Sequence, residues 1–148
     1  MIARIERISL AISEISRYWH KIAGDEMEKY GLKSSHAMYL TTMYHYKNGI
    51  TATSLCELCS KDKSDVSRMM SIMEKKGLVK KEGENNYRAL LKLTDEGKKL
   101  AEKVRSLATL AVELAGKELS PKKREIFYES LSIITENLKI ISKEGLPE

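Results

Sequence analysis

The chain of 148 residues lacks several features that define large classes of proteins. It has no apolar run that approaches about 18 residues, the length that a transmembrane helix needs. Its N-terminus alternates charged residues with isoleucine and has no apolar segment of the kind found in signal peptides. These absences predict a cytoplasmic protein that neither spans nor binds a membrane.

Cysteine is scarce, with two copies at Cys56 and Cys59. Two cysteines this close together do not make the disulfide framework of a secreted protein, so a reducing compartment fits best. Their C-x-x-C spacing leaves two interpretations open. The pair is either a redox switch that responds to oxidants, or two small hydrophobic side chains, as free cysteines often are.

Motifs of catalysis and nucleotide binding are also missing. The sequence contains no G-x-G-x-x-G, no Walker loop, no H-E-x-x-H and no G-x-S-x-G. A metal sensor would need clustered ligands, but His20, His36 and His45 are scattered, and no second C-x-x-C is present to complete a zinc site. We therefore expect no enzyme activity, no cofactor and no metal site.

Positive charge is present in excess and is concentrated in one segment. The formal net charge is +5. Residues 61–105 carry 13 basic and 8 acidic side chains, whereas residues 1–60 have a net charge of +1 and residues 106–148 of −1. This distribution favours an anionic partner for the middle of the chain, although a charged segment can also be a solvated surface.

The same middle segment, Thr51 to Leu93, has the order of elements of a winged helix-turn-helix. A short helix is expected from Thr51 to Cys59, and a second from Asp62 to Lys76, where Gly77 ends it. Two strands follow, Leu78 to Glu82 and Tyr87 to Leu93, with the turn G-E-N-N between them. Thr51 and Asp62 are the expected N-caps of the two helices.

The second helix of this segment should have two different faces. Four apolar residues recur at helical spacing and should pack inward. They are Val66, Met69, Met70 and Met73. Asp65 stands among the polar residues of the outer face, where it would repel phosphate unless it caps the helix or accepts a hydrogen bond from cytosine.

Amphipathic helices are predicted on both sides of the segment. Residues 2–30 carry an isoleucine-rich stripe, residues 34–47 form a second helix capped by Ser34 or Ser35, and Ile50 and Thr51 suit a short strand beside the wing. A helix from Thr94 or Asp95 and a last helix after Ser120-Pro121 follow. At least two faces of the last helix need to be covered, so we expect the termini to form a dimerisation layer.

Several stretches resemble the multiple-antibiotic-resistance regulator (MarR) family. The first is L-C-E-L-C-S-K-D-K-S-D-V-S-R-M-M-S-I-M-E-K-K-G-L-V, which is similar to the helix-turn-helix of the family. L-L-K-L-T-D-E-G-K-K-L resembles its junction between wing and helix, and L-S-P-K-K-R-E-I-F the start of its final helix. The resemblance covers nearly the whole chain, with the elements in the same order.

The resemblance implies a mainly α-helical protein with a small β-wing, a winged helix-turn-helix flanked by dimerisation helices. One 148-residue domain is expected, with 34–105 as the DNA-binding region and 1–33 and 106–148 as the dimerisation helices. It would be a homodimeric transcriptional regulator, most often a repressor, that binds double-stranded DNA at a palindromic operator. The expected DNA contacts are Lys63, Ser64, Ser67, Arg68 and Ser71 in the major groove and Arg88 of the wing in the minor groove.

The sequence departs from the family at two places. The wing turn is short and keeps only Arg88 of the usual arginine pair, so its contact with the minor groove is in question. Ser60 stands where glycine is common between the two helices of the motif, which predicts a turn with a less strained backbone than usual.

Aromatic residues concentrate between positions 18 and 46, and they suggest a crevice for a small aromatic or lipophilic effector. The candidate effector-binding residues are Trp19, Tyr39, Met43 and Tyr46. The alternative for each is ordinary core packing. A different class of function is also open, in which the winged helix docks on another protein and binds no operator.

Overall fold

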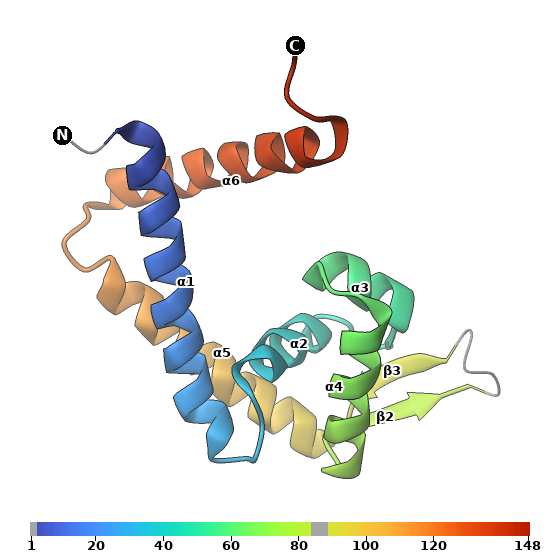
Figure 1. The fold of residues 1–148 in the computed structure, drawn as a ribbon. Helices are drawn as coiled ribbons and strands as arrows, with labels where there is room; N and C mark the ends of the chain where they lie inside the picture. The colour runs from blue at the N-terminus through green and yellow to red at the C-terminus, as the bar shows by residue number, and fades with distance from the viewer. Residues whose placement is uncertain (1–2, 84–88) are drawn as a thin grey trace. The chain divides into compact units, whose positions relative to one another are not determined.

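The computed structural model describes residues 3–83 and 89–148 (Figure 1). The helices are α1 (Arg4–Glu28), α2 (Ser34–Tyr44), α3 (Ala52–Cys59), α4 (Lys63–Lys75), α5 (Asp95–Ala115) and α6 (Pro121–Glu144), and the strands are β1 (Ile50–Thr51), β2 (Val79–Glu82) and β3 (Leu90–Leu93). The chain divides into two compact units, Met1–Ala108 and Thr109–Glu148, with the boundary inside α5. The predicted fold class, mainly α-helical with a small β-wing, is confirmed.

The first unit begins with two helices that pack against each other, α1 and α2. Gly31 lies just after α1 with φ +66°, a left-handed conformation that glycine adopts without steric cost. The predicted cap of α2 was wrong, because the helix already begins at Ser34 and the N-cap is Lys33. The backbone N–H of Lys33 instead donates to Nδ1 of His36 at 2.9 Å, which satisfies one orphan donor of the helix start.

The sheet has three antiparallel strands in the order β1-β3-β2. β1 pairs Ile50 with Leu91, which confirms the short strand predicted beside the wing. β2 and β3 form the hairpin, with Val79 opposite Leu93. Leu91 and Leu93 are buried and Leu90 is only half-buried, so the alternation expected of a half-buried strand holds in the described part of the hairpin.

A close backbone contact joins the end of α4, the sheet and the start of α5. The Thr94 N–H donates to the carbonyl of Leu78 at 3.0 Å, and its hydroxyl donates to the carbonyl of Gly77 at 2.5 Å. The same hydroxyl accepts from the N–H of Gly97 at 3.1 Å. A Cβ on Gly97 would lie 2.0 Å from the carbonyl oxygen of Leu78, so only glycine allows α5 to approach this closely.

The core of the first unit is formed by side chains of all its elements, and in Figure 1 α2 lies beside the group made by α3, α4 and the hairpin. Its largest fully buried side chains are Tyr39, Met27, Leu40, Leu55, Met73, His36 and Val66. The four apolar residues predicted to face inward from α4 are all buried. This core fixes α4 in place and leaves its opposite face exposed.

The second unit contains the end of α5, a turn and α6. Ser120 caps α6 by accepting from the N–H of Lys123 at 3.3 Å, and Pro121 follows at the first helical position, as predicted. Arg124 closes the turn, because its guanidinium donates to Glu113 Oε2 and to the carbonyl of Gly116, both at 2.7 Å. No described residue of α6 is buried in the single chain. Within the ranges that the structure describes, no helix is both long and apolar enough to cross a membrane.

Candidate nucleic-acid interface

The turn between α3 and α4 is tight and its backbone is strained. Ser60 adopts φ 52° and ψ 45°, and it is the one non-glycine residue with positive φ in residues 3–83 and 89–148. The expectation of a less strained turn was therefore wrong. The left-handed residue lets the Lys61 N–H reach the carbonyl of Cys56 at 3.0 Å, which ends α3 and redirects the chain into α4.

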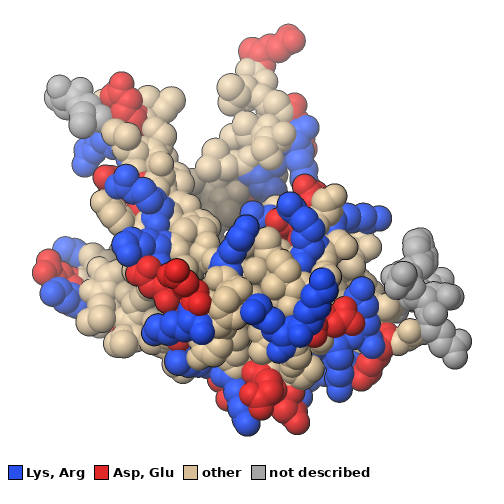
Figure 2. Space-filling view, turned by 60° about the horizontal axis from the view of Figure 1, so that its bottom comes forward, with Lys and Arg blue, Asp and Glu red and all other residues tan. Residues whose placement is uncertain are grey.

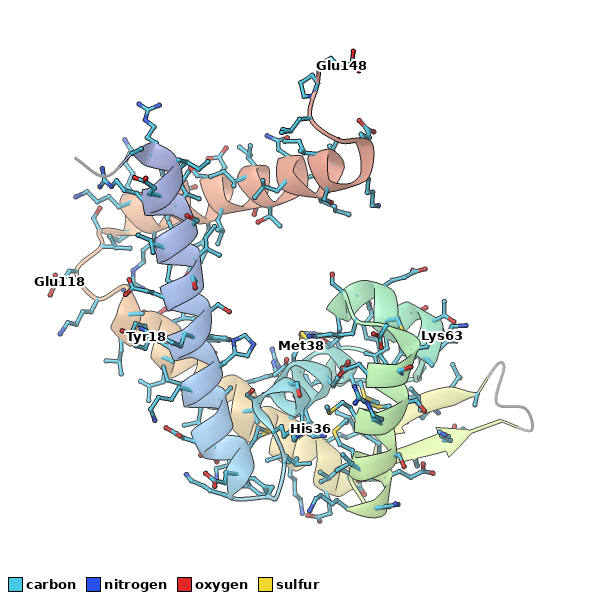
Figure 3. The ribbon with its side chains drawn as sticks, viewed as in Figure 1. Tyr18, His36, Met38, Lys63, Glu118 and Glu148 are labelled. Atoms are coloured by element: carbon cyan, nitrogen blue, oxygen red, sulfur yellow. The ribbon has the colours of Figure 1, made fainter. Side chains whose placement is uncertain are left out.

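α4 presents a polar face opposite its buried one. Asp62 caps the helix, as predicted, by accepting from the N–H of Asp65 at 2.7 Å. All five residues predicted to contact the major groove are exposed: Lys63, Ser64, Ser67, Arg68 and Ser71. Ile72, Glu74 and Lys75 of α4 are exposed as well. Lys63, labelled in Figure 3, lies at the start of α4. Hydroxyl and cationic groups at the N-terminal half of an exposed helix suit base edges and phosphates.

Asp65 is engaged within the protein in a way that the sequence did not predict. Its Oδ2 accepts a hydrogen bond from the hydroxyl of Tyr39, which comes from α2. Its Oδ1 accepts from Nη2 of Arg68 at 3.4 Å. Asp65 is thus neither the helix cap nor an unpartnered acid, since both carboxylate oxygens have partners inside the protein.

The wing carries less free positive charge than the sequence suggests. Lys92 forms a salt bridge with Glu82 at 2.6 Å, and Lys80 lies 3.7 Å from the same carboxylate. The hydrogen bond from Lys92 holds the pKa of Glu82 below its ordinary value. Lys81 is exposed, and Arg88 lies outside the described residues. Figure 2 likewise shows lysine and arginine side chains interspersed with acidic ones over the face in view.

The two cysteines lie in α3 and are free thiols. Cys59 is buried, and its Sγ donates to Oγ1 of Thr42 at 3.6 Å, whereas Cys56 is half-buried. Burial raises the pKa of the Cys59 thiol, which decreases the fraction of reactive thiolate at neutral pH. This environment suits the small hydrophobic role better than that of a redox sensor.

The three histidines do not come together in the structure. His36 is buried in the core, whereas His20 and His45 are exposed on other parts of the first unit. In the part of the chain that the structure describes, no group of three or more histidine, cysteine or carboxylate side chains could hold a metal ion.

The four candidate effector-binding residues occupy different environments. Tyr39 and Met43 are buried in the core, while Trp19 and Tyr46 are partly exposed. A pocket of about 260 Å³ lies at the end of α2, beside β3 and α5. Its lining consists of Met43, Tyr44, Tyr46, Lys47, Leu93, Lys98 and Glu102. The pocket thus includes Met43 and Tyr46 but neither Trp19 nor Tyr39.

The hydrogen bond between Tyr39 and Asp65 was the main feature that sequence reasoning missed. Tyr39 lies 26 residues before Asp65, so no local spacing connects the two. The one signal in the sequence was Asp65 itself, an acid on a face of hydroxyls and cations that needs a compensating partner.

Solved structures with the same architecture were found by structural comparison. A MarR transcriptional regulator from Methanosarcina mazei Go1 has a TM-score of 0.81 and 29% identity, with 91% of this chain and 99% of that one covered. A putative MarR family transcriptional regulator from Listeria monocytogenes, complexed with 26mer DNA, has a TM-score of 0.80 and 22% identity over 100% and 99%. MepR of Staphylococcus aureus in its DNA complex has a TM-score of 0.78 and 21% identity over 88% and 95%.

Comparisons with protein-family models and with curated proteins found no match. The helix-turn-helix made by α3 and α4, followed by the β2–β3 hairpin, defines a winged-helix protein. The similarity to the Methanosarcina and Listeria regulators is more specific, because the chain shares with them the winged-helix fold of MarR regulators over nearly its whole length. These neighbours, and SlyA among others, are named as transcriptional regulators.

Proposed function

We propose that this chain is a transcriptional regulator that binds double-stranded DNA sequence-specifically as a homodimer. The observation that carries the proposal is the exposed face of α4, whose five polar side chains stand on a helix held rigidly by its buried face. In such motifs the second helix enters the major groove, and its N-terminal half contacts base edges. The neighbours from Listeria and Staphylococcus, solved with DNA, support the assignment.

Within this face Arg68 has the best chemistry for base reading. Its side chain is 71% exposed, and a guanidinium can make bidentate hydrogen bonds to guanine. Lys63 and the three serines suit phosphates or base edges. Arg88 of the wing remains our proposed minor-groove residue, because a narrow minor groove concentrates negative potential.

The homodimer is supported by apolar surface on α1 and on α6. The isoleucines of the α1 stripe, from Ile5 to Ile22, are each more than half exposed in the single chain. On α6 the apolar side chains are also exposed, among them Phe127, Leu131, Ile134 and Leu138. Surface of this kind needs a cover, and a second copy of the chain supplies one with two-fold symmetry that suits a palindromic operator.

DNA binding is tested by measuring affinity for the duplex upstream of the gene and for a shuffled duplex, as salt is raised. We expect tighter binding to the natural duplex and a linear fall of log K with log salt concentration. Arg68→Ala should weaken binding to the natural duplex more than binding to the shuffled one, so that the ratio of the two affinities falls by a factor of roughly 10 to 100. Lys117→Ala, at an exposed position in the second unit, is the control and should change neither affinity.

Equal affinity for the two duplexes would refute the proposal. It would favour the alternative that the basic winged helix docks on another protein. Equal losses on both duplexes in the Arg68→Ala protein would assign that side chain to phosphate binding, without a part in base reading.

We further propose that the regulator is a repressor relieved by a small effector in the pocket beside Met43 and Tyr46. The pocket combines these side chains with Lys47 and Lys98, whose two positive charges exceed the one negative charge of Glu102, so the lining suits an aromatic molecule with an acidic group. Benzoate serves as the probe. It should raise the melting temperature of the protein and weaken its binding to the operator. Tyr46→Ala should abolish both effects and Trp19→Ala neither; an unchanged response in the Tyr46→Ala protein would exclude this pocket.

A further inference from the structure

The carboxylate of Asp65 connects the core of the first unit with the exposed face of α4. One oxygen accepts from the Tyr39 hydroxyl on the inner side, and the other accepts from Nη2 of Arg68 on the outer side. The Asp65 side chain is 21% exposed, whereas that of Arg68 is 71% exposed. The three residues therefore form a chain of contacts that leads from buried α2 to the proposed base-reading side chain.

Tyr39 is the buried end of this series of hydrogen bonds. Its side chain is fully buried, with 0% exposure, and His36 lies one turn before it in the same core. Burial, together with the hydrogen bond to Asp65, raises the pKa of the Tyr39 hydroxyl well above its ordinary value of 10. The hydroxyl therefore stays protonated at physiological pH and remains a hydrogen-bond donor to the carboxylate.

An arginine on the surface is normally mobile, and an exposed ion pair alone restrains it weakly. Here the carboxylate cannot follow the guanidinium, because the buried tyrosine holds its other oxygen. A side chain that is already ordered loses less conformational entropy when it binds, which favours the one arrangement that fits the correct base.

We propose that Tyr39 and Asp65 are positioning residues that hold the Arg68 guanidinium in the orientation that reads the operator. This inference rests on the proposed function and adds a source of specificity to it. Neither residue needs to contact DNA. Because an acid close to the phosphates opposes binding, Asp65 reduces affinity for any duplex while it increases the preference for the right one.

The first test requires no DNA. The ¹⁵N relaxation of the Arg68 Nε–H group is measured in the free protein and in two variants that each lose one hydroxyl of α2. We expect a rigid group in the wild-type protein and a clearly more mobile one in Tyr39→Phe, which keeps the buried ring. Tyr44→Phe is the matched control, because that hydroxyl donates to Glu102 of α5 and should leave Arg68 unchanged. Unchanged relaxation in Tyr39→Phe would overturn the positioning pair.

The second test is a double-mutant cycle on DNA preference, the ratio of affinities for operator and shuffled duplex. Tyr39→Phe should lower this ratio roughly tenfold, as expected for the loss of one hydrogen bond to a charged group. In the Arg68→Ala background the same substitution should have no further effect, because the side chain that it positions is gone. Equal losses in both backgrounds would show a general structural role and overturn the inference.

Asp65→Ala serves as a second variant, which removes the carboxylate and keeps the buried Tyr39 side chain. It should lower the preference by a similar factor while it increases affinity for the shuffled duplex. A lower affinity for both duplexes would contradict the proposed role of the carboxylate. A wild-type protein that binds all duplexes equally would refute the proposed function, whereas the relaxation data would still support or overturn the pairing of Tyr39, Asp65 and Arg68.

Discussion

His36 is a buried imidazole with only one of its two ring nitrogens satisfied. Nδ1 accepts from the Lys33 N–H, which leaves the proton on Nε2, and Nε2 has no hydrogen-bond partner among the described residues. Burial lowers the pKa of His36 below its ordinary value of 6.5, and nearby Lys33 and Lys76 lower it further, whereas Asp65 and the Lys33 carbonyl, which can accept from a protonated Nδ1, raise it. The folded protein therefore favours the neutral ring.

The lowered pKa of His36 makes stability depend on pH in a defined direction. Between the lowered pKa and 6.5 the unfolded chain binds a proton that the folded chain does not. The stability that comes from the neutral His36 ring is fully present above pH 6.5, the ordinary pKa. It is lost as the pH falls toward the lowered pKa of His36 in the folded protein. We expect thermal unfolding temperatures to fall from pH 7.5 to pH 5, and less steeply in His36→Gln.

His45→Gln is the control for this prediction, because His45 is exposed at the end of α2. Its pH profile should follow that of the wild-type protein. Parallel profiles for wild type and His36→Gln would mean that another group, not His36, causes the pH dependence.

Single residues also show how far the sequence alone could go. Asp62 as the cap of α4 and Ser120 as the cap of α6 were predictable, because a cap and the backbone N–H that donates to it lie three residues apart. The left-handed Ser60 was predicted wrongly, since a serine carries no local signal for positive φ and the close approach of α3 and α4 imposes it. The partner of Asp65 depends on a tertiary contact and could not be predicted.

At the scale of elements, the junction of α4, β2 and α5 depends on Gly97. A methyl group at this position would lie 2.0 Å from the Leu78 carbonyl oxygen, and backbone has to move to admit it. We expect Gly97→Ala to lower the free energy of unfolding by about 2 kcal/mol or more, measured by urea denaturation.

Gly24→Ala is the matched control for the junction. It lies in α1, where the nearest atom to a new Cβ is 3.7 Å away, an ordinary contact. Because alanine favours a helix over glycine, this variant should gain about 0.5–1 kcal/mol. Equal stabilisation by both substitutions would show that α5 does not need the close approach to Leu78.

The elements themselves were predicted well where their pattern is local. The helical spacing of the isoleucines predicted α1, and the helical spacing of Val66 and the methionines predicted the buried face of α4. α2 ends at Tyr44, three residues earlier than the expected 47. A turn follows in which the Gly49 N–H donates to the carbonyl of Tyr46 at 2.9 Å, and Gly49 has φ +98°. Hydrophobic spacing and composition do not define the last residue of a helix, because the contacts of the segment that follows determine where it ends.

At the scale of the whole molecule, the exposed apolar surfaces of α1 and α6 are the basis for the proposed dimer. We expect sedimentation equilibrium to give twice the chain mass of 16.8 kDa. Ile134→Lys, on the apolar side of α6, should shift the protein toward the monomer, because a charge does not tolerate burial in an apolar interface.

Ser132→Lys is the control for the dimer prediction, since Ser132 lies on the polar side of the same helix. It should remain a dimer at the same concentration. A wild-type protein that sediments as a monomer would refute the proposed role of both surfaces and would leave the palindromic operator without its structural reason.

The most direct test of the account is the selection of bound sequences from a pool of random duplexes. We predict enrichment of one motif with two half-sites in inverted orientation, their centres about 10 base pairs or a multiple of this apart. Arg68→Ala should lose the preference at a defined position within each half-site. A pool that stays random after repeated selection, although the protein binds it, would contradict the claim that this chain reads DNA sequence.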